Sequence, residues 1–429
     1  RLVRRQHSGW SHVWKRRDFL AAAAALRSLE AIAAPQKKNQ KAPARSAKKS
    51  SSKPAASRKK KTAATRSRKA PARPIAPPPS AENSVIDNPP AGTSATRLPP
   101  VRAAEVPQQW KQFEIVTTLK LKASTPCRFW LPLPLDQDGL YQRLNSQQWQ
   151  SNSPKLTLSR LPDGQLEVLY AEWRGGEEAQ LQLVTQISTA DRQFDITRRS
   201  MAPEREDILR RALQASENIP NEGPIRQLGE RIIGRIKDPV AQAKAIYDWI
   251  TENCLYNSTL AGCGSGNVNQ QLSSGIYGGR SADINGLFVA LCRSMGIPAR
   301  TVPGLRIGPS KLLHSLGINN GDATHAQHVR AEFYVPGYAW IPTDPSDVCR
   351  AIARESMGPH DSRLDALKRV LFGVWEMNWI ALNNGNDLLL PGDNARQAFF
   401  AHPKVLLDQQ VLDSLNPLFT PYTISTRSL

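Results

Sequence analysis

Three short segments of this 429-residue chain carry the residue types of a nucleophilic site. In the first, Ser281 follows Arg280 and a glycine pair at positions 278 and 279, which lets the backbone turn sharply into a helix. The backbone N–H groups and the dipole at a helix start favour negative charge. A nucleophile or an oxyanion at Ser281 would therefore be stabilised.

The other two segments supply a base and a group that orients it. His328 leads into an expected strand at 329–335, and Asp344 ends the next expected strand at 339–343 after a Pro-Gly turn. A histidine and an aspartate on paired strands can be hydrogen-bonded to each other, which is the base-and-orienter half of a nucleophilic triad. His325 is an alternative base, but the alternation of a strand favours His328.

The residues before and between these segments predict the helices that position them. Apolar residues recur at helical spacing over 225–236, and again over 243–250 after an Asp-Pro pair that is typical of a helix start. A third helix is expected over 281–295, where a following glycine ends it. The stretch 257–279 is rich in Gly, Ser and Asn, and we predict a loop there.

A strand-rich region precedes the helices. Apolar and polar residues alternate over 113–121, and the apolar runs at 156–158 and 166–170 flank a Pro-Asp-Gly turn. Residues 181–184 continue the pattern. Short strands at this spacing predict a small antiparallel β-sandwich over residues 108–200.

These motifs together resemble one family. Residues 279–291, followed by 296–300, resemble the nucleophile helix of bacterial transglutaminase-like proteins, which belong to the papain-like cysteine-enzyme superfamily. Residues 327–334 resemble the histidine strand of that family, and residues 336–345 resemble its aspartate segment. The stretches 262–264 and 375–379 look like further features of one exported bacterial subfamily.

The resemblance covers roughly residues 110–395 and implies an α+β fold. A papain-like transglutaminase core is expected at 201–347, after the β-sandwich at 108–200. A C-terminal extension at 348–429 is expected to pack on that core.

The resemblance also implies a chemistry and its residues. His328 would be the general base and Asp344 its orienter, and the reaction would be acyl transfer through a thioester. The acyl donor would be a glutamine-like amide or a peptide carbonyl, and water or an amine would accept the acyl group. A peptide or protein is therefore the expected partner, and we expect no cofactor and no metal, since no zinc spacing or calcium loop occurs.

Ser281 stands where the family carries its nucleophilic cysteine. A helix start and a nearby histidine can convert a thiol into a thiolate, whereas a hydroxyl is far too weak an acid for that. Four interpretations stay open: a catalytically silent binding module, a serine that replaces the cysteine of an active enzyme, a slow serine nucleophile, or a substitute nucleophile at Cys263.

Several other residues near these motifs have two interpretations. Tyr277, Trp340 and Cys263 are candidates to line a groove, with Trp375 and Trp379 beside them, although aromatic residues more often belong to a core. Asp283 and Asn285 lie at the helix start, where we expect structural roles.

The cysteines are scattered along the chain. None of the five forms a CxxC pair, so we predict free buried thiols. Cys254 and Cys263 are close enough in sequence to form a disulfide if the chain is exported.

The N-terminal quarter has a composition of its own. Residues 1–34 contain Arg-Arg-Asp-Phe-Leu before a short alanine-rich run, which resembles a twin-arginine export signal and predicts a periplasmic or cell-envelope protein. Residues 35–107 are rich in Lys, Arg, Ala, Pro and Ser, with too few large apolar residues to build a core, and we predict a disordered spacer.

The net charge of +20 belongs almost entirely to that quarter. Residues 1–106 hold 24 of the 57 basic residues and 5 of the 37 acidic ones, so the remainder is nearly neutral. Anionic lipid head groups or envelope polymers are the expected partners of the basic segment after export, with a nucleic-acid arm or a simple solvated spacer as alternatives. The chain contains no stretch of about 18 apolar residues, so we predict no membrane span.

Overall fold

The computed structural model describes residues 107, 109–136, 141–162, 165–194, 203–413, 415–416 and 419–429. All of these lie in one compact unit that spans Thr93–Leu429. The predicted signal at 1–34 and almost all of the predicted spacer at 35–107 lie outside the described residues. The division of the remainder into three domains stays a prediction.

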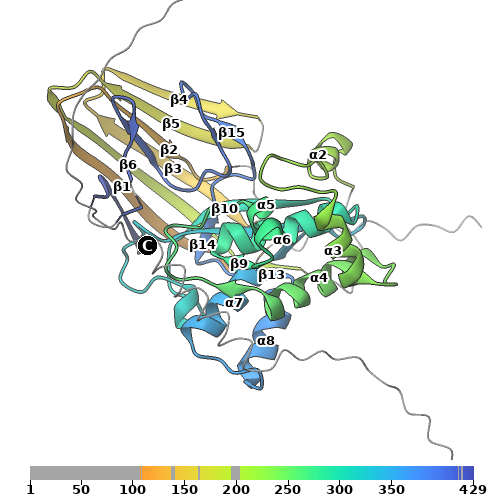
Figure 1. The fold of residues 1–429 in the computed structure, drawn as a ribbon. Helices are drawn as coiled ribbons and strands as arrows, with labels where there is room; N and C mark the ends of the chain where they lie inside the picture. Colours follow the sequence, from red (N-terminus) through yellow and green to blue (C-terminus); the bar gives the residue numbers. More distant parts are fainter. Residues whose placement is uncertain are drawn as a thin grey trace, which may run out of the picture. The chain divides into compact units, whose positions relative to one another are not determined.

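Two antiparallel sheets form a β-sandwich (Figure 1). One sheet has the order β19-β1-β6-β3, and the other has the order β18-β17-β2-β5-β4. The strands of the first sheet are β1 (Lys111–Ala123), β3 (Gln142–Ser151), β6 (Glu177–Thr189) and β19 (Tyr422–Ser428). Those of the second are β2 (Cys127–Pro132), β4 (Lys155–Leu161), β5 (Leu166–Trp173), β17 (Lys404–Leu407) and β18 (Gln410–Val411).

The alternation read from the sequence places one face of each strand in the sandwich core. In β1, Phe113, Ile115 and Leu119 are buried, and they belong to the same apolar cluster as Phe129 of β2 and Leu183 of β6. A period of two residues puts every second side chain on the same face of a strand. The expected sandwich is therefore present.

The end of the chain completes both sheets. β19 pairs with β1 along the outer edge, from Phe113 opposite Ser428 to Leu119 opposite Tyr422. β17 pairs with β2 in the second sheet. From the sequence, these residues were expected only as a C-terminal extension, because a strand's pattern does not reveal which sheet it joins.

The remaining elements form the mixed α/β core. A four-stranded antiparallel sheet has the order β12-β11-β10-β14, and helix α6 packs against its strands β10 and β11 (Figure 1). The strands are β10 (Ala299–Arg306), β11 (Gln327–Val335), β12 (Ala339–Thr343) and β14 (Trp379–Ala381). The principal helices are α3 (Pro224–Ile233), α4 (Pro239–Asn253), α6 (Ser281–Ser294), α7 (Pro345–Arg354) and α8 (Ser362–Val370).

The three predicted helices are all present at the expected places. The start of α4 shows why, since the side chain of Asp238 accepts a hydrogen bond from the backbone N–H of Ala241 at 2.9 Å and Pro239 occupies the first turn. Within the described residues, no helix is long and apolar enough to cross a membrane.

The prediction of an uninterrupted loop at 257–279 was wrong. It contains helix α5 (Val268–Ser274), which begins where the side chain of Asn267 accepts a hydrogen bond from the N–H of Gln270 and ends at Gly275 in a left-handed conformation. Asparagine and glycine are typical of helix ends as well as loops, so composition alone did not separate the two. The short elements are α2 (Glu206–Arg211), η1 (His314–Leu316), β7 (Arg192–Gln193), β8 (Leu255–Tyr256), β9 (Gly278–Gly279), β13 (Val374–Trp375), β15 (Leu388–Leu389) and β16 (Arg396–Gln397).

Candidate active site

Ser281 is the first residue of α6 and is buried. The glycine pair that precedes it forms β9, where both residues have a positive φ. A Cβ atom at Gly278 would lie 2.1 Å from the carbonyl oxygen of Leu255, so no other residue fits this approach. The Ser281 hydroxyl accepts a hydrogen bond from the backbone N–H of Val329 at 3.1 Å.

Asp283 holds the loop before the site against the start of α6. One of its carboxylate oxygens accepts hydrogen bonds from the N–H groups of Ser265 and Gly266, and the other accepts from the N–H of Arg280 at 2.8 Å. These contacts fix the loop that carries Cys263 beside the helix start. The structural role expected for Asp283 agrees with this arrangement.

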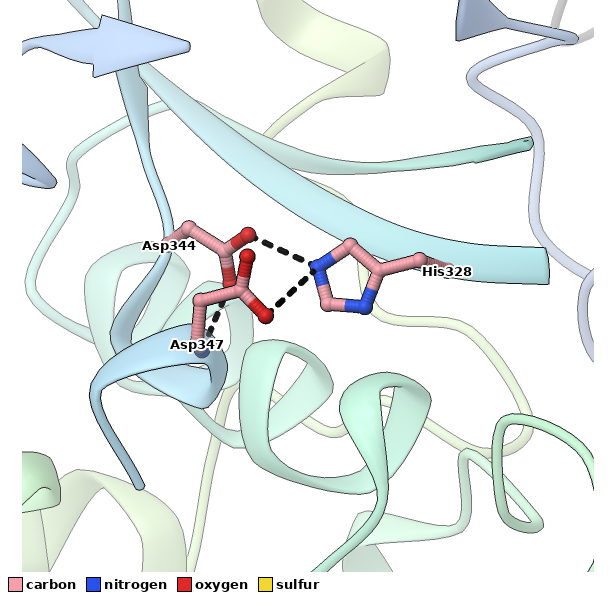
Figure 2. Close-up of side chains that lie close together, drawn as sticks. All are labelled: His328, Asp344 and Asp347. Atoms are coloured by element: carbon pink, nitrogen blue, oxygen red, sulfur yellow. Dashed lines mark hydrogen bonds and ion pairs between the residues drawn. The ribbon is translucent and has the colours of Figure 1, made fainter. Parts of the chain in front are cut away.

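His328 and Asp344 are directly hydrogen-bonded. Nε2 of His328 lies 2.7 Å from Oδ2 of Asp344 and 3.5 Å from Oδ1 of Asp347, and all three side chains are buried. Figure 2 shows the two carboxylates on the Nε2 side of the imidazole, while Nδ1 faces away from them. Nδ1 is therefore the nitrogen that is available as a base.

The second oxygen of Asp344 is held by a separate set of donors. Oδ1 accepts hydrogen bonds from Nδ2 of Asn285 at 3.0 Å, Oγ of Ser346 at 2.9 Å and the N–H of Asp347 at 3.1 Å. Asn285 also donates to the carbonyl oxygen of Val329. This buried amide thus connects the nucleophile helix, the histidine strand and the aspartate.

Two buried arginines balance the carboxylates. Nη2 of Arg306 lies 2.5 Å from Oδ1 of Asp347, and Nε of Arg330 lies 3.4 Å from Oδ2 of Asp344. Burial lowers the pKa of His328 well below its ordinary value, and the nearby Arg306 and Arg330 act in the same direction. The imidazole is therefore neutral at physiological pH, which is the form a general base requires.

The same cluster has the composition of a metal site. His328, Asp344 and Asp347 each offer a ligand atom, and these atoms lie within 4.8 Å of one another. However, the guanidinium groups of Arg306 and Arg330 already lie beside both carboxylates. Two fixed positive charges oppose the entry of a cation, so we interpret the cluster as a base with its orienting group.

The three residues predicted to act together lie on adjoining segments. The N–H that binds the Ser281 hydroxyl belongs to Val329, the residue next to His328. No hydrogen bond joins Ser281 to His328 in the part of the chain that the structure describes. His325, the alternative base, is exposed, and its Nε2 lies 3.3 Å from Oγ1 of Thr420.

Cys263 lies beside the start of α6, in one apolar cluster with Ala282 and Val329. Its carbonyl oxygen accepts a hydrogen bond from the N–H of Ala282 at 2.9 Å. Burial raises the pKa of the Cys263 thiol to about 11, although the hydroxyl of Ser281 and the positive charge of Arg280 act against that shift. The five cysteines are all free and buried, as predicted, and Cys254 and Cys263 are not joined.

The aromatic groove candidates are largely embedded in the fold. Trp340 is buried against Tyr334, and its Nε1 donates to Glu204. Trp375 and Trp379 are buried in one cluster, where Trp379 donates to the carbonyl oxygen of His328 at 3.0 Å. Tyr277 is partly buried and packs edge-on against Trp249. Their assignment to a groove stays a prediction.

Sequence reasoning missed three residues of this region: Arg306, Asp347 and His402. Asp347 follows Asp344 by one helical turn, so the turn that begins α7 was a usable signal. Arg306 lies on the neighbouring strand β10, and His402 lies far along the chain near β17, where no local pattern connects either residue to the site.

The comparison with known families agrees with this geometry. Residues 226–345 match the sequence model of the transglutaminase-like superfamily, a range that includes Ser281, His328 and Asp344. The chain has a transglutaminase-like core. The α+β fold expected from the sequence, with a transglutaminase-like core after a β-sandwich, is present.

Three individual proteins are similar to this chain. An uncharacterized protein of Haemophilus influenzae is 28% identical over 326 residues, which are 70% of this chain and 86% of that protein. A candidate cysteine protease from Cytophaga hutchinsonii is 16% identical with a TM-score of 0.42, over 75% of this chain and 99% of that one. The periplasmic domain of TgpA from Pseudomonas aeruginosa is 15% identical with a TM-score of 0.31, over 57% of this chain and 92% of that one.

Proposed function

We propose that this protein binds peptide or protein segments on its transglutaminase-like core, and that acyl transfer through Ser281 is weak or absent. The observation that carries the proposal is the serine at the start of α6, beside a retained His328–Asp344 pair. The scaffold keeps the base and its orienting group but presents a hydroxyl at the nucleophile position.

The chemical argument rests on the difference between a hydroxyl and a thiol. A helix start favours an anion, but a serine hydroxyl is too weak an acid to ionise there. Serine must instead lose its proton to a base during attack, which needs a direct hydrogen bond to that base. The Ser281 hydroxyl accepts from the N–H of Val329, and no hydrogen bond to His328 is present among the described residues to take its proton.

A second candidate function is a Ser281-dependent amidase or peptidase. It is supported by the neutral state of His328, because a neutral imidazole is what general-base activation of a hydroxyl requires. A covalent acyl-enzyme on Ser281 separates this candidate from a binding protein without turnover.

The test compares the native chain with its Ser281→Cys variant. Both are assayed for peptide hydrolysis and for incorporation of a fluorescent amine into a glutamine-rich protein, and labelling by iodoacetamide is mapped by peptide mass spectrometry. We expect labelling at position 281, and efficient turnover through that position, only in the variant, because its thiol lies at the helix start within reach of the histidine strand. His328→Gln in the variant background should abolish both.

Each other outcome has a definite meaning. Turnover by the native chain together with an acyl group on Ser281 would establish the serine amidase instead. If the folded Ser281→Cys variant shows neither turnover nor labelling at position 281, the proposal of a retained catalytic scaffold is wrong. Binding of glutamine-containing peptides by both chains, measured by calorimetry, tests the binding half of the proposal separately.

We also propose a location in the cell envelope. The twin-arginine-like sequence at 1–34 supports export, and the basic residues of the segment 35–107 would then attract anionic lipid head groups or envelope polymers. Export is tested by replacing Arg16 and Arg17 with lysine and fractionating the cells. Retention of the normal location after that change would contradict a twin-arginine route.

A further inference from the structure

A second pairing of a sulfur and an imidazole lies beside the proposed site. Sγ of Cys263 is 3.9 Å from Nε2 of His402, although the two residues are 139 positions apart. Gly262 makes room for the imidazole, because a Cβ atom there would lie 2.9 Å from Nε2. The sequence resemblance gives no role to His402.

This pair adjoins the start of α6. Cys263 is in one apolar cluster with Ala282 and Val329, the residues next to Ser281 and His328, and Phe399 packs against that cluster. The thiol is also close enough for the Ser281 hydroxyl to lower its pKa. Cys263 therefore lies at the same helix start that would stabilise an anion at position 281.

A surface hollow of about 600 Å³ lies beside the pair, with His402 in its lining and the buried Cys263 behind it. His402 lines it and is partly exposed, and Ser265 lines it two residues beyond Cys263. Apolar side chains such as Phe399 and Leu412 form much of the lining, with polar groups between them. An apolar hollow with a few polar groups suits an acyl or peptide segment.

We propose that Cys263 is the nucleophile of this site, with His402 as its general base, toward the carbonyl carbon of an amide or ester bound in the hollow. This inference rests on the proposed binding of peptide or protein segments. It assigns any residual acyl chemistry of the native chain to Cys263 instead of Ser281.

The reaction balances with water as the second reactant. Nε2 of His402 takes the thiol proton while Sγ attacks the carbonyl carbon, and the bond from that carbon to nitrogen or oxygen breaks as the leaving group receives the proton. Water then attacks the thioester and gives a proton to His402. Cleavage of the bond between sulfur and carbon returns the thiol, with its proton from His402, and releases the acid.

Burial governs the rate of this chemistry. It keeps the thiol protonated and lowers the pKa of His402 to about 4, so both partners are neutral at physiological pH. Attack must then be concerted with proton transfer, and the high thiol pKa makes the sulfur a stronger nucleophile once its proton is removed. We expect slow acylation, because the reagent must reach a buried sulfur past the imidazole.

The test is acylation of the full chain by p-nitrophenyl acetate, a small ester, with the modified residue located by peptide mass spectrometry. We expect the acetyl group on Cys263, a complete loss of that adduct in Cys263→Ser, and a rate reduced about a hundredfold in His402→Gln. His360→Gln changes an exposed histidine in the turn before α8 and should leave the rate unchanged. The four other buried cysteines are internal controls for nonspecific reaction.

Three results would overturn the assignment: an acetyl group on Ser281, equal rates in the native chain and in folded His402→Gln, or equal modification of all five cysteines. Absence of any adduct on the native chain, while Ser281→Cys is acetylated at position 281, would also reject Cys263. Since the ester does not depend on peptide binding, failure here leaves the peptide-binding proposal to its own calorimetric test.

Discussion

The imidazole of His328 is held by Asp344 through a 2.7 Å contact at Nε2, and its own backbone carbonyl is held by the indole of Trp379. Asp344 in turn begins helix α7 as its cap residue, so the carboxylate cannot rotate without losing the hydrogen bonds that start the helix. The orientation of the base is thereby coupled to the fold of the core.

The first prediction concerns Asp344→Asn in the Ser281→Cys background. The amide keeps the shape of the carboxylate but cannot stabilise a positively charged imidazole, so we expect kcat to fall by on the order of 10³–10⁴ with little change in KM. Steady-state kinetics measures both constants. Asp361→Asn is a matched control, because Asp361 caps α8 in the same way, and it should leave kcat unchanged. A similar kcat in both variants would contradict the orienting role of Asp344.

The second prediction concerns the buried pair of Arg306 and Asp347. Arg306→Met leaves a buried carboxylate without its partner, and we expect the free energy of unfolding to fall by about 3–5 kcal/mol. Urea denaturation measures the loss. Arg363→Met removes an arginine whose ion pair with Asp361 lies at the surface, and it should leave the free energy of unfolding nearly unchanged.

The double variant Arg306→Met with Asp347→Asn sharpens that test. Removal of both charges should recover part of the stability lost in the single variant, because no uncompensated charge stays buried. An additive loss in the double variant would show that packing, and not charge pairing, dominates the contribution of Arg306.

The third prediction is a loss of stability in mild acid. The pKa of His402 is about 4, so its imidazole stays neutral in the folded protein between pH 6.5 and 5. Burial also lowers the pKa of His328 well below its ordinary value, which acts in the same direction. The unfolded chain binds protons at these histidines in that range, so the free energy of unfolding decreases as the pH falls. The slope contributed by His402 should approach about 1.4 kcal/mol per pH unit, and His328 adds to it with the same sign.

Urea midpoints at several pH values between 7.5 and 5 check this prediction. His402→Gln should make the pH dependence shallower. A native protein whose stability is constant over this range would contradict the exclusion of protons from the imidazoles of His402 and His328.

The fourth prediction concerns the C-terminal strand β19. Ile424 is buried between the sheets, and its neighbour Thr423 is exposed on the same strand. We expect Ile424→Ala to lower the free energy of unfolding by about 2–5 kcal/mol, and Thr423→Ala to change it by less than about 1 kcal/mol. Thermal unfolding of both variants provides the measurement. Equal and small effects would mean that β19 contributes little to the sandwich.

Local patterns were sufficient for much of the fold. The alternation in β1 and the helical spacing in α3 and α4 each report which face of an element is buried, and burial of that face drives its formation. The loop prediction at 257–279 failed because glycine and asparagine also mark the ends of a short helix such as α5.

The sequence by itself determined the nucleophile position, the base and its orienting group, since Ser281, His328 and Asp344 lie in motifs whose order and local structure carry the chemistry. Only the tertiary structure decided what surrounds them. Arg306 and His402 reach the site through sheet pairing and long-range packing, which depend on complementary shape and charge between distant segments. A periodic pattern specifies that a side chain is buried, but it does not specify its partner.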